Sequence, residues 1–173
     1  MKKKTKLLIG FISPSGSGKT YIAKILAGKL RAVHIRTDDI RVALRRIGES
    51  YSSAPMRAGR ARDAALAAGK SVVMDFDAVL LKRRQELAAV AKRFGARLFF
   101  IRVKTPEHVI LARLRRHRYT NGFFRSAREA IRTYYIRRAL HRKQLLPRAD
   151  FVINNARPSA PQIRRIVDRI KGL

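Results

Sequence analysis

The sequence contains no cysteine, and only 11 of its 173 residues are acidic. A chain without cysteine can form neither a disulfide nor a thiolate metal site. Long apolar runs are also missing, since none approaches the roughly 20 residues that a membrane-spanning helix needs. The basic start at residues 1–6 has features of a signal peptide, but the apolar run after it is short and leads into a glycine-rich turn instead of a cleavage site. We therefore expect a cytoplasmic protein with no membrane partner.

Basic residues, in contrast, are abundant. Lys and Arg together number 41, and the formal net charge is +30 at pH 7. A charge of this size is informative about partners, and nucleic acid is the obvious polyanion. The alternative is a generally solvated basic surface, because the basic residues are spread along the whole chain. With 46% hydrophobic residues, the composition is that of a globular protein.

The rest of the sequence is organised around residues 13–20, which read Ser-Pro-Ser-Gly-Ser-Gly-Lys-Thr. This segment follows an apolar run at residues 7–12, which predicts a buried strand, and precedes residues 21–30, whose apolar positions recur at helical spacing. A strand, a glycine-rich turn ending in Gly-Lys-Thr, and a helix form the context of a phosphate-binding P-loop, or Walker A motif. A glycine-rich turn without a ligand is the alternative.

Each residue type in this loop has a chemical reason. Gly16 and Gly18 let successive backbone N–H groups turn toward phosphate oxygens, and the helix start adds a positive dipole end. Lys19 reaches the β- and γ-phosphates, and the Thr20 hydroxyl can ligate Mg²⁺. Ser13 stands where the usual pattern has its first glycine, so some strain is expected there. The predicted cofactors are ATP and Mg²⁺, and the predicted nucleotide-binding residues of the loop are Ser15, Gly16, Ser17, Gly18, Lys19, Thr20 and Tyr21.

Four of the eleven acidic residues follow two predicted strands. Asp38 and Asp39 end the apolar run at residues 31–37, and Asp75 and Asp77 follow the run at residues 71–74. In an open parallel sheet, ligands bind at the carboxyl ends of the strands, so these carboxylates are expected beside the P-loop. There they suit Mg²⁺ ligation and proton abstraction from an attacking hydroxyl. The alternative is that these carboxylates cap helix N-termini. For Asp39 capping and a role in the reaction are equally favoured, whereas for Asp38 and Asp75 a role in the reaction is favoured.

The remaining sequence alternates between predicted helices and strands. This alternation predicts one α/β domain, residues 1–173, with a parallel sheet and right-handed crossovers. Thr105 is expected to be the N-cap of a helix, with Pro106 at its first position. A mobile loop is expected at residues 119–124. Helices are predicted at residues 39–47, 56–68, 79–94, 105–117, 126–146 and 159–170, and strands at residues 96–103 and 149–154.

These motifs resemble the P-loop kinases grouped around phage polynucleotide kinase and the zeta toxins. The segments that carry the resemblance are residues 16–20, 37–41, 72–75 and 83–84. It implies a three-layer αβα fold with a five-stranded parallel sheet of order 2-3-1-4-5 and a helical lid at about residues 113–130. It also implies that Asp38 is the catalytic base, that Arg41 binds the substrate, and that Asp75 serves the acceptor and the metal. Where family members often have Thr-Asn, this chain has Phe76-Asp77.

The C-terminal part of the sequence is similar to uridine kinases and dephospho-CoA kinase at residues 134–141 and 149–155. In those enzymes the strand-end segment borders the adenine pocket, which implies a nucleotide contact for Asn154. The histidines show no metal spacing and are expected to be structural or surface residues; they are His34, His108, His117 and His141.

Arginines flank the predicted lid loop, at positions 113, 116, 118, 125 and 128. Phosphoryl transfer needs cations around the γ-phosphate, and the planar fork of arginine suits phosphate. Arg113 and Arg116 share one helix face. We expect Arg113 to bind the nucleotide and Arg116 to act in catalysis, although for any one arginine a solvated face is the alternative. Aromatic residues of this loop could stack on a base, or simply hold the loop against the core.

The sequence therefore predicts an ATP- and Mg²⁺-dependent kinase with Lys19 and Asp38 at its catalytic centre. The charge favours the 5′-hydroxyl of a polynucleotide, RNA or DNA, as the acceptor. A kinase acting on a small molecule such as a nucleoside, sugar or drug would use the same site with a closed acceptor pocket. A non-catalytic, nucleotide-gated RNA-binding protein is a further alternative.

Overall fold

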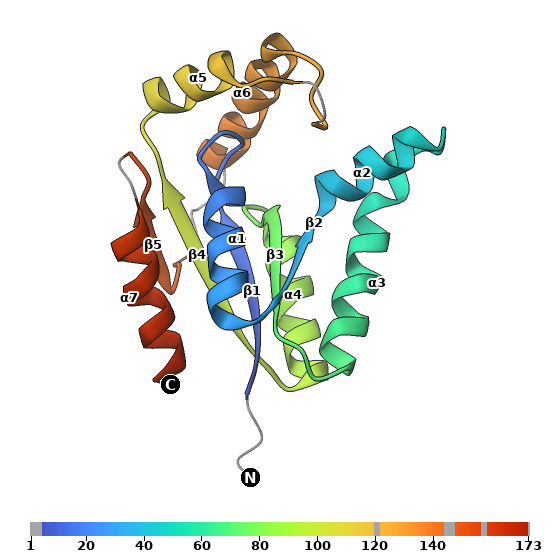
Figure 1. The fold of residues 1–173 in the computed structure, drawn as a ribbon, viewed down its shortest axis with the longest axis vertical. Helices are drawn as coiled ribbons and strands as arrows, with labels where there is room; N and C mark the ends of the chain where they lie inside the picture. The colour runs from blue at the N-terminus through green and yellow to red at the C-terminus, as the bar shows by residue number, and fades with distance from the viewer. Residues whose placement is uncertain (1–4, 120–121, 144–147, 157–158, 173) are drawn as a thin grey trace.

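The computed structural model describes residues 5–119, 122–143, 148–156 and 159–172 (Figure 1). Its centre is a five-stranded parallel sheet of order β2-β3-β1-β4-β5, which confirms the predicted fold class and strand order. The strands are β1 (Lys6–Ile12), β2 (Val33–Arg36), β3 (Val72–Asp77), β4 (Ala96–Lys104) and β5 (Phe151–Asn154).

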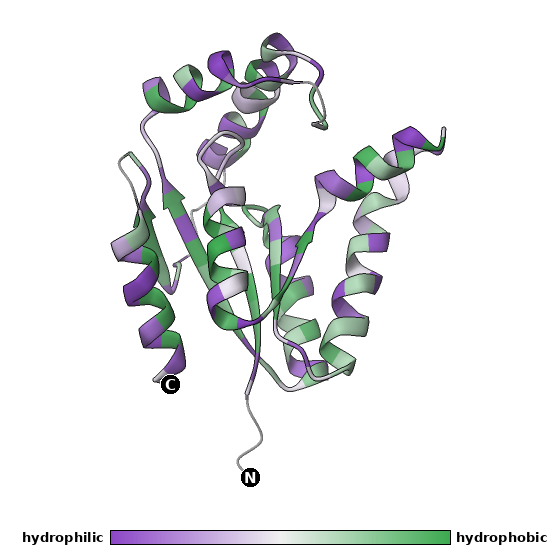
Figure 2. Ribbon diagram, viewed as in Figure 1, coloured by the Kyte–Doolittle hydropathy of each residue, from purple (hydrophilic) through white to green (hydrophobic). Residues whose placement is uncertain are grey.

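Helices cover both faces of the sheet. They are α1 (Lys19–Leu30), α2 (Thr37–Arg46), α3 (Ala54–Ala67), α4 (Leu81–Phe94), α5 (Glu107–Arg116), α6 (Ala127–Lys143) and α7 (Ala160–Lys171), with a 3₁₀ turn at Tyr51–Ser53. Buried side chains of α1 and α7 pack on one face, and those of α3 and α4 pack on the other. In Figure 2 the central strands are mostly green, whereas the helices alternate between green and purple along their length. The result is the predicted three-layer αβα arrangement.

The central strand β1 explains why the sheet is buried on both faces. Leu8 and Ile9 point to opposite faces, because side chains alternate along a strand, and both are fully buried. A parallel strand covered by helices on two sides has a continuous apolar run, as β1 has. The P-loop follows directly after the carboxyl end of β1 and therefore lies at that end of the sheet.

Helices α5 and α6 form a third group of packed side chains, separate from the two sheet faces. Ile110 and Leu114 of α5 contact Ala130 and Tyr134 of α6. In Figure 1 this pair lies across the carboxyl end of the sheet, above the start of α1. We call residues 107–143 the α5–α6 segment. None of the helices in the described ranges is long and apolar enough to cross a membrane.

Some boundaries differ from the prediction in ways that matter for the site. Strand β3 continues to Asp77, so Asp75 lies within the strand rather than after it. Helix α2 begins at Thr37, which places Asp38 and Asp39 in its first turn, and neither caps it. There the carboxylates face the positive end of the helix dipole.

The predicted helix start at Thr105 is wrong. The N-cap of α5 is Pro106, and the Thr105 hydroxyl instead donates a hydrogen bond to the Ser17 carbonyl of the P-loop, at 2.9 Å. Within the predicted mobile loop, residues 120–121 lie outside the described residues, as do residues 144–146 of the predicted helix.

Candidate active site

The P-loop connects β1 to α1 through two glycines with left-handed backbone angles. Gly16 has a φ of 79° and Gly18 a φ of 88°, which residues with a Cβ rarely adopt. Space is limiting as well, since a Cβ on Gly18 would lie 2.1 Å from Asn155 Nδ2. Both glycines are therefore required by the path of the loop.

The strain expected at Ser13 is absent. Among the described non-glycine residues only Arg31 has a positive φ, so Ser13 fits the turn without a left-handed conformation. Its backbone N–H donates to Asp77 Oδ1 at 3.1 Å. The hydroxyl of Ser13 is buried and has no hydrogen-bond partner, and the same holds for Ser17. The departure from glycine thus leaves a buried hydroxyl unpaired rather than a distorted backbone.

Asp75 is the most strongly perturbed acid of the site. Its side chain is fully buried, and its carboxylate lies 2.6 Å from Lys19 Nζ and 3.3 Å from His34 Nε2. Burial alone would raise the pKa of Asp75, but hydrogen bonds from His34, Lys19 and Thr20 and the charge of Lys19 outweigh it. The pKa is therefore held well below its usual range, and Asp75 stays ionised.

The pairing of Thr20 with Asp75 provides an oxygen donor set that fits a hard cation. The Thr20 side chain lies near enough to the Asp75 carboxylate to lower its pKa, so both groups lie beside the start of α1. Mg²⁺ is commonly held by one or two protein oxygens together with substrate phosphates. This agrees with the finding that the described residues contain no cluster of three or more histidines, cysteines or acids that could hold a metal by itself.

A cavity of about 620 Å³ opens beside the P-loop. It brings together five of the predicted site residues, namely Ser15, Lys19, Asp38, Arg41 and Asp75. Asp38 is about one-third exposed, and its carboxylate accepts a hydrogen bond from Arg41 at 2.7 Å. The two residues predicted to bind the acceptor from α2 therefore form an ion pair on the cavity wall.

The cavity is closed on one side by the chain that leads into α6. The guanidinium of Arg45 donates to the carbonyls of Gly122 at 2.8 Å and Phe123 at 3.0 Å. The Phe123 ring lies 5.0 Å from the Arg41 guanidinium carbon and 5.6 Å from the Tyr51 ring. These contacts join the α5–α6 segment to α2 and the 3₁₀ turn across the mouth of the cavity.

A second set of contacts lies on the opposite side of the P-loop. Arg113 donates to the carbonyls of Asn155 at 2.8 Å and Ser17 at 3.4 Å, and Asn155 Nδ2 donates to Ser17 at 2.8 Å. Asn155 is only 5% exposed. The predicted Asn154 is exposed instead, and its side chain accepts from the Ala156 N–H.

Strand periodicity could have identified Asn155. Burial alternates along β5, with Phe151 and Ile153 buried and the residues between them exposed. Continuing this alternation places Asn155 inward and Asn154 outward. The structure thus places Asn155, and not the predicted Asn154, beside the P-loop.

Two other predicted residues lie away from this cavity. Arg116 is exposed and lines a separate cavity of about 580 Å³ together with His108, Arg113 and His117. The structure does not bring it together with Lys19 and Asp38. Tyr21 is 57% exposed on α1.

Sequence reasoning missed the role of Asp77 and two histidines. Asp77 Oδ1 accepts from the backbone N–H groups of Ser13 and Val79, while Oδ2 contacts His141 Nε2 at 2.7 Å. His34 and His141, expected to be structural, thus each hold a carboxylate at the end of β3. No local pattern signals the contact with His141, because the two residues are 64 positions apart.

Comparison with known proteins extends this description. A family model described as an AAA domain matches residues 8–156. A comparison with curated proteins finds no match. Among solved structures, the APS kinase CysC of Mycobacterium tuberculosis, in complex with AMPPNP and APS, is similar with a TM-score of 0.66 at 18% identity, covering 96% of this chain and 98% of that chain.

Two further solved structures are similar in the same way. A sugar kinase from Janibacter sp. HTCC2649 has a TM-score of 0.60 at 20% identity, covering 96% of this chain and 95% of its own. A gluconokinase from Sinorhizobium meliloti 1021 has a TM-score of 0.60 at 18% identity, covering 98% of each chain. At these identities the likeness establishes the fold.

The prediction of a P-loop kinase is confirmed at the level of the fold, but the polynucleotide kinase subgroup is not singled out by these matches. The glycine turns, Lys19 beside Asp75 and the strand order all agree with that fold. Because the matched segment covers well over half of the chain, the protein belongs to this AAA domain family and has the fold of a P-loop kinase.

Proposed function

We propose that the protein is a kinase that transfers the γ-phosphate of ATP to a hydroxyl group of a small-molecule acceptor. The observation that supports this most directly is the cavity of about 620 Å³ beside the P-loop, which the α5–α6 segment narrows on one side. Small-molecule sites typically have volumes of about 300–1,000 Å³. The contacts of Arg45 and Phe123 across its mouth leave a compartment that suits a compact acceptor.

In this proposal the P-loop side of the cavity holds the phosphates. The backbone N–H groups of the loop and the start of α1 bind phosphate oxygens, and Lys19 moves from Asp75 to the β- and γ-phosphates. Thr20 and Asp75 would hold Mg²⁺, which when bound neutralises charge on the phosphate oxygens. Asp75 remains ionised for this purpose because its pKa lies below its usual range.

The acceptor side is served by α2. Asp38 takes the proton of the attacking hydroxyl, and a base in reach of that proton is worth about 10²–10⁴-fold in rate. Arg41 orients the Asp38 carboxylate through its 2.7 Å hydrogen bond and is available to the acceptor on the same wall. The α5–α6 segment acts as the lid, because Gly122 and Phe123 reach α2 across the mouth of the cavity, where further closure on a bound acceptor would exclude water.

The base of the nucleotide is proposed to lie on the other side of the loop. Arg113 and Asn155 meet there at the carbonyl of Ser17, and the exposed face of Arg113 is part of the smaller cavity on α5. Arg116 borders this smaller cavity, so its expected catalytic role is replaced by one near the nucleotide. The kinases with similar solved structures, named for APS, a sugar and gluconate, further favour a small acceptor.

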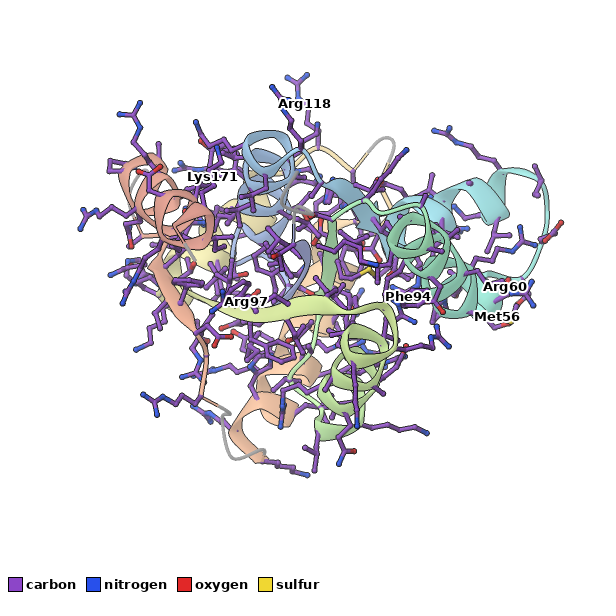
Figure 3. The ribbon with its side chains drawn as sticks, turned by 90° about the horizontal axis from the view of Figure 1, so that it is seen from below. Met56, Arg60, Phe94, Arg97, Arg118 and Lys171 are labelled. Carbon is purple, nitrogen blue, oxygen red and sulfur yellow. The ribbon has the colours of Figure 1, made fainter. Side chains whose placement is uncertain are left out.

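A polynucleotide 5′-hydroxyl is the second candidate acceptor, and the charge of the chain favours it. Residues 107–143 contain eleven Lys or Arg and only two acidic residues. A polynucleotide needs an open groove past the P-loop, however, whereas the chain at Phe123 closes that side in the structure. The basic residues also point outward from well-separated places, as Arg60 and Arg118 do in Figure 3.

Phosphate transfer from γ-labelled ATP separates the two candidates. Wild-type protein is offered sugars, sugar acids, nucleosides and a 5′-hydroxyl oligonucleotide over a series of salt concentrations, with Asp38→Asn as the inactive control. Use of a small acceptor with little salt dependence supports the proposal. Preferred use of the oligonucleotide, with log kcat/KM falling by about 0.7 per contacted phosphate for each unit of log salt, contradicts it.

A further inference from the structure

We propose that the acceptor carries a negatively charged group and that Arg137 on α6 binds it. This inference rests on the proposed small-molecule kinase and names the chemical class of its substrate. Arg137 lines the main cavity, and nothing in the family match or in the similar structures assigns it a role. The shared chemistry is an anionic oxygen group, either a carboxylate or a phosphate or sulfate ester.

The carboxylates of the main cavity all contact basic side chains other than Arg137. Asp38 is paired with Arg41, and Asp75 with Lys19. Glu86 binds both Arg62 and Arg83, at 3.0 and 3.1 Å, and Asp63 binds Arg62 at 2.8 Å outside the cavity lining. Asp77 contacts His141. Each carboxylate of the cavity lining therefore already has a partner other than Arg137.

Arg137 is a further basic residue of the cavity lining. It is the one basic side chain of the cavity lining for which the described part of the chain provides neither an ion pair nor a hydrogen bond. It is partly buried, and a guanidinium removed from water without a partner is unfavourable. An anionic ligand in the cavity supplies the missing partner, and the planar fork of arginine binds carboxylate or phosphate through two parallel hydrogen bonds.

The position of Arg137 on α6 indicates the acceptor rather than the nucleotide. Thr133, Arg137 and His141 are four residues apart, so they lie on one face of the helix. Thr133 and Arg137 both line the main cavity, and His141 binds Asp77 at the end of β3. This face of α6 therefore stands over the end of β3, next to the wall that holds Asp38 and Arg41.

The nucleotide side has cations of its own. Lys19 and the start of α1 serve the phosphates, and Arg113 lies beside Ser17 and Asn155. Arg137 is on the other helix of the α5–α6 segment and contributes to the main cavity rather than to the cavity on α5. Of the two helices, α6 is thus assigned to the acceptor and α5 to the nucleotide.

Selectivity for anions follows from this geometry. Hydrogen bonds to charged groups are worth enough to change affinity by about 10-fold to 100-fold. We expect kcat/KM for an anionic acceptor to exceed that for its neutral counterpart by that factor. Replacing Arg137 by glutamine should remove the preference while leaving the affinity for ATP unchanged.

The control variant comes from the same helix. Arg132 is exposed on α6, so Arg132→Gln removes the same charge from the same element without touching the cavity lining. Any loss caused by the lower net charge alone appears in both variants. Thermal unfolding of both variants confirms that each is folded.

The first measurement is binding and requires no turnover. Wild type, Arg137→Gln and Arg132→Gln are loaded with AMPPNP, which occupies the γ-phosphate position, and titrated calorimetrically with D-gluconate, D-glucose 6-phosphate and D-glucose. Binding of an anionic probe to wild type and Arg132→Gln, with loss of at least 10-fold in Arg137→Gln, supports the inference. Equal binding of the anions to all three proteins, or no binding of either anion to wild type, overturns it.

The second measurement is phosphate transfer to the same three compounds, together with the KM for ATP. A preference for the anionic compounds that disappears only in Arg137→Gln supports the inference. An increase in the KM for ATP in that variant, with the acceptor preference unchanged, overturns it and assigns Arg137 to the γ-phosphate. If the anions bind through Arg137 but no small molecule is phosphorylated, the inference about the anion site stands and the proposed kinase activity fails.

Discussion

Replacing Lys19 by methionine should destabilise the protein even without nucleotide. The substitution keeps the length of the side chain but removes the charge that lies 2.6 Å from the fully buried carboxylate of Asp75. Asp75 then keeps its contacts with His34 at 3.3 Å and with the Arg36 guanidinium at 3.8 Å, but its closest cation is gone. A P-loop lysine that contacted only the ligand would leave the stability of the free protein unchanged.

The expected loss is at the lower end of the range for a broken buried ion pair. Removing one partner of such a pair costs about 3–5 kcal/mol, and the remaining partners of Asp75 limit the loss to about 3 kcal/mol. For a protein of this size, each kcal/mol shifts Tm by about 2–4 °C, so Tm should fall by about 6–12 °C. Urea unfolding at pH 7 without nucleotide measures the loss directly.

The double variant Lys19→Met/Asp75→Asn identifies the cause. Because it has no buried carboxylate, it should be more stable than Lys19→Met alone. The pKa of native Asp75 lies below its usual range, so the stabilisation is present above the pKa of the unfolded state and is lost only as pH falls toward the native value. In Lys19→Met, burial is no longer opposed by Lys19 and raises the pKa of Asp75, so the loss of stability should be full at pH 7 and should shrink toward acidic pH as the carboxyl is protonated. A Lys19→Met protein within about 0.5 kcal/mol of wild type would refute the reasoning.

Three further predictions test other parts of the site. Asp38→Asn should lower kcat by about 10²–10⁴-fold with ATP binding retained, as measured by steady-state kinetics and an ATP titration; a defect confined to ATP affinity would contradict its role as the base. Asn155→Ala removes the buried hydrogen bond to the Ser17 carbonyl and should weaken ATP binding by about tenfold, as measured by calorimetry. Unchanged affinity for ATP would argue against a nucleotide contact at Asn155. Phe123→Ala removes the ring that packs on Arg41 and should raise the KM for the acceptor. It should also raise the ratio of ADP formed to acceptor phosphorylated, because water then reaches the γ-phosphate. An unchanged ratio would show that this ring does not exclude water.

The fold was predictable because its signals are local and repeated. Most strands have an apolar run and most helices an apolar periodicity, and the glycine-rich turn at residues 13–20 marks the carboxyl end of the first strand. The ends of elements were less certain. Strand β3 continues through Asp75 and Asp77, whose carboxylates contact Lys19, His34 and His141. The residues immediately around the two aspartates do not reveal these partners.

Some residues of the candidate site could be predicted from sequence motifs, and others could not. Lys19, Asp38 and Arg41 were found because they belong to motifs contiguous in sequence, and the structure places all three around one cavity. Arg137 and His141 were missed because their significance depends on how α6 crosses the end of the sheet. That crossing depends on the cluster of buried side chains that α5 and α6 share, which includes Ile110 and Tyr134 and which no periodicity specifies.

Asp77 has a consequence for the redesign of substrate range. One oxygen of this carboxylate holds the backbone at the entrance to the P-loop, and the other holds the helix that carries Arg137. An insertion that shifts α6 outward to admit a larger substrate would therefore also loosen the loop that holds the nucleotide. Helices α2 and α3 offer a better starting point, since no hydrogen bond within the described ranges joins either of them to residues 13–18. Libraries directed at that wall can enlarge the pocket while the phosphate-binding loop keeps its shape.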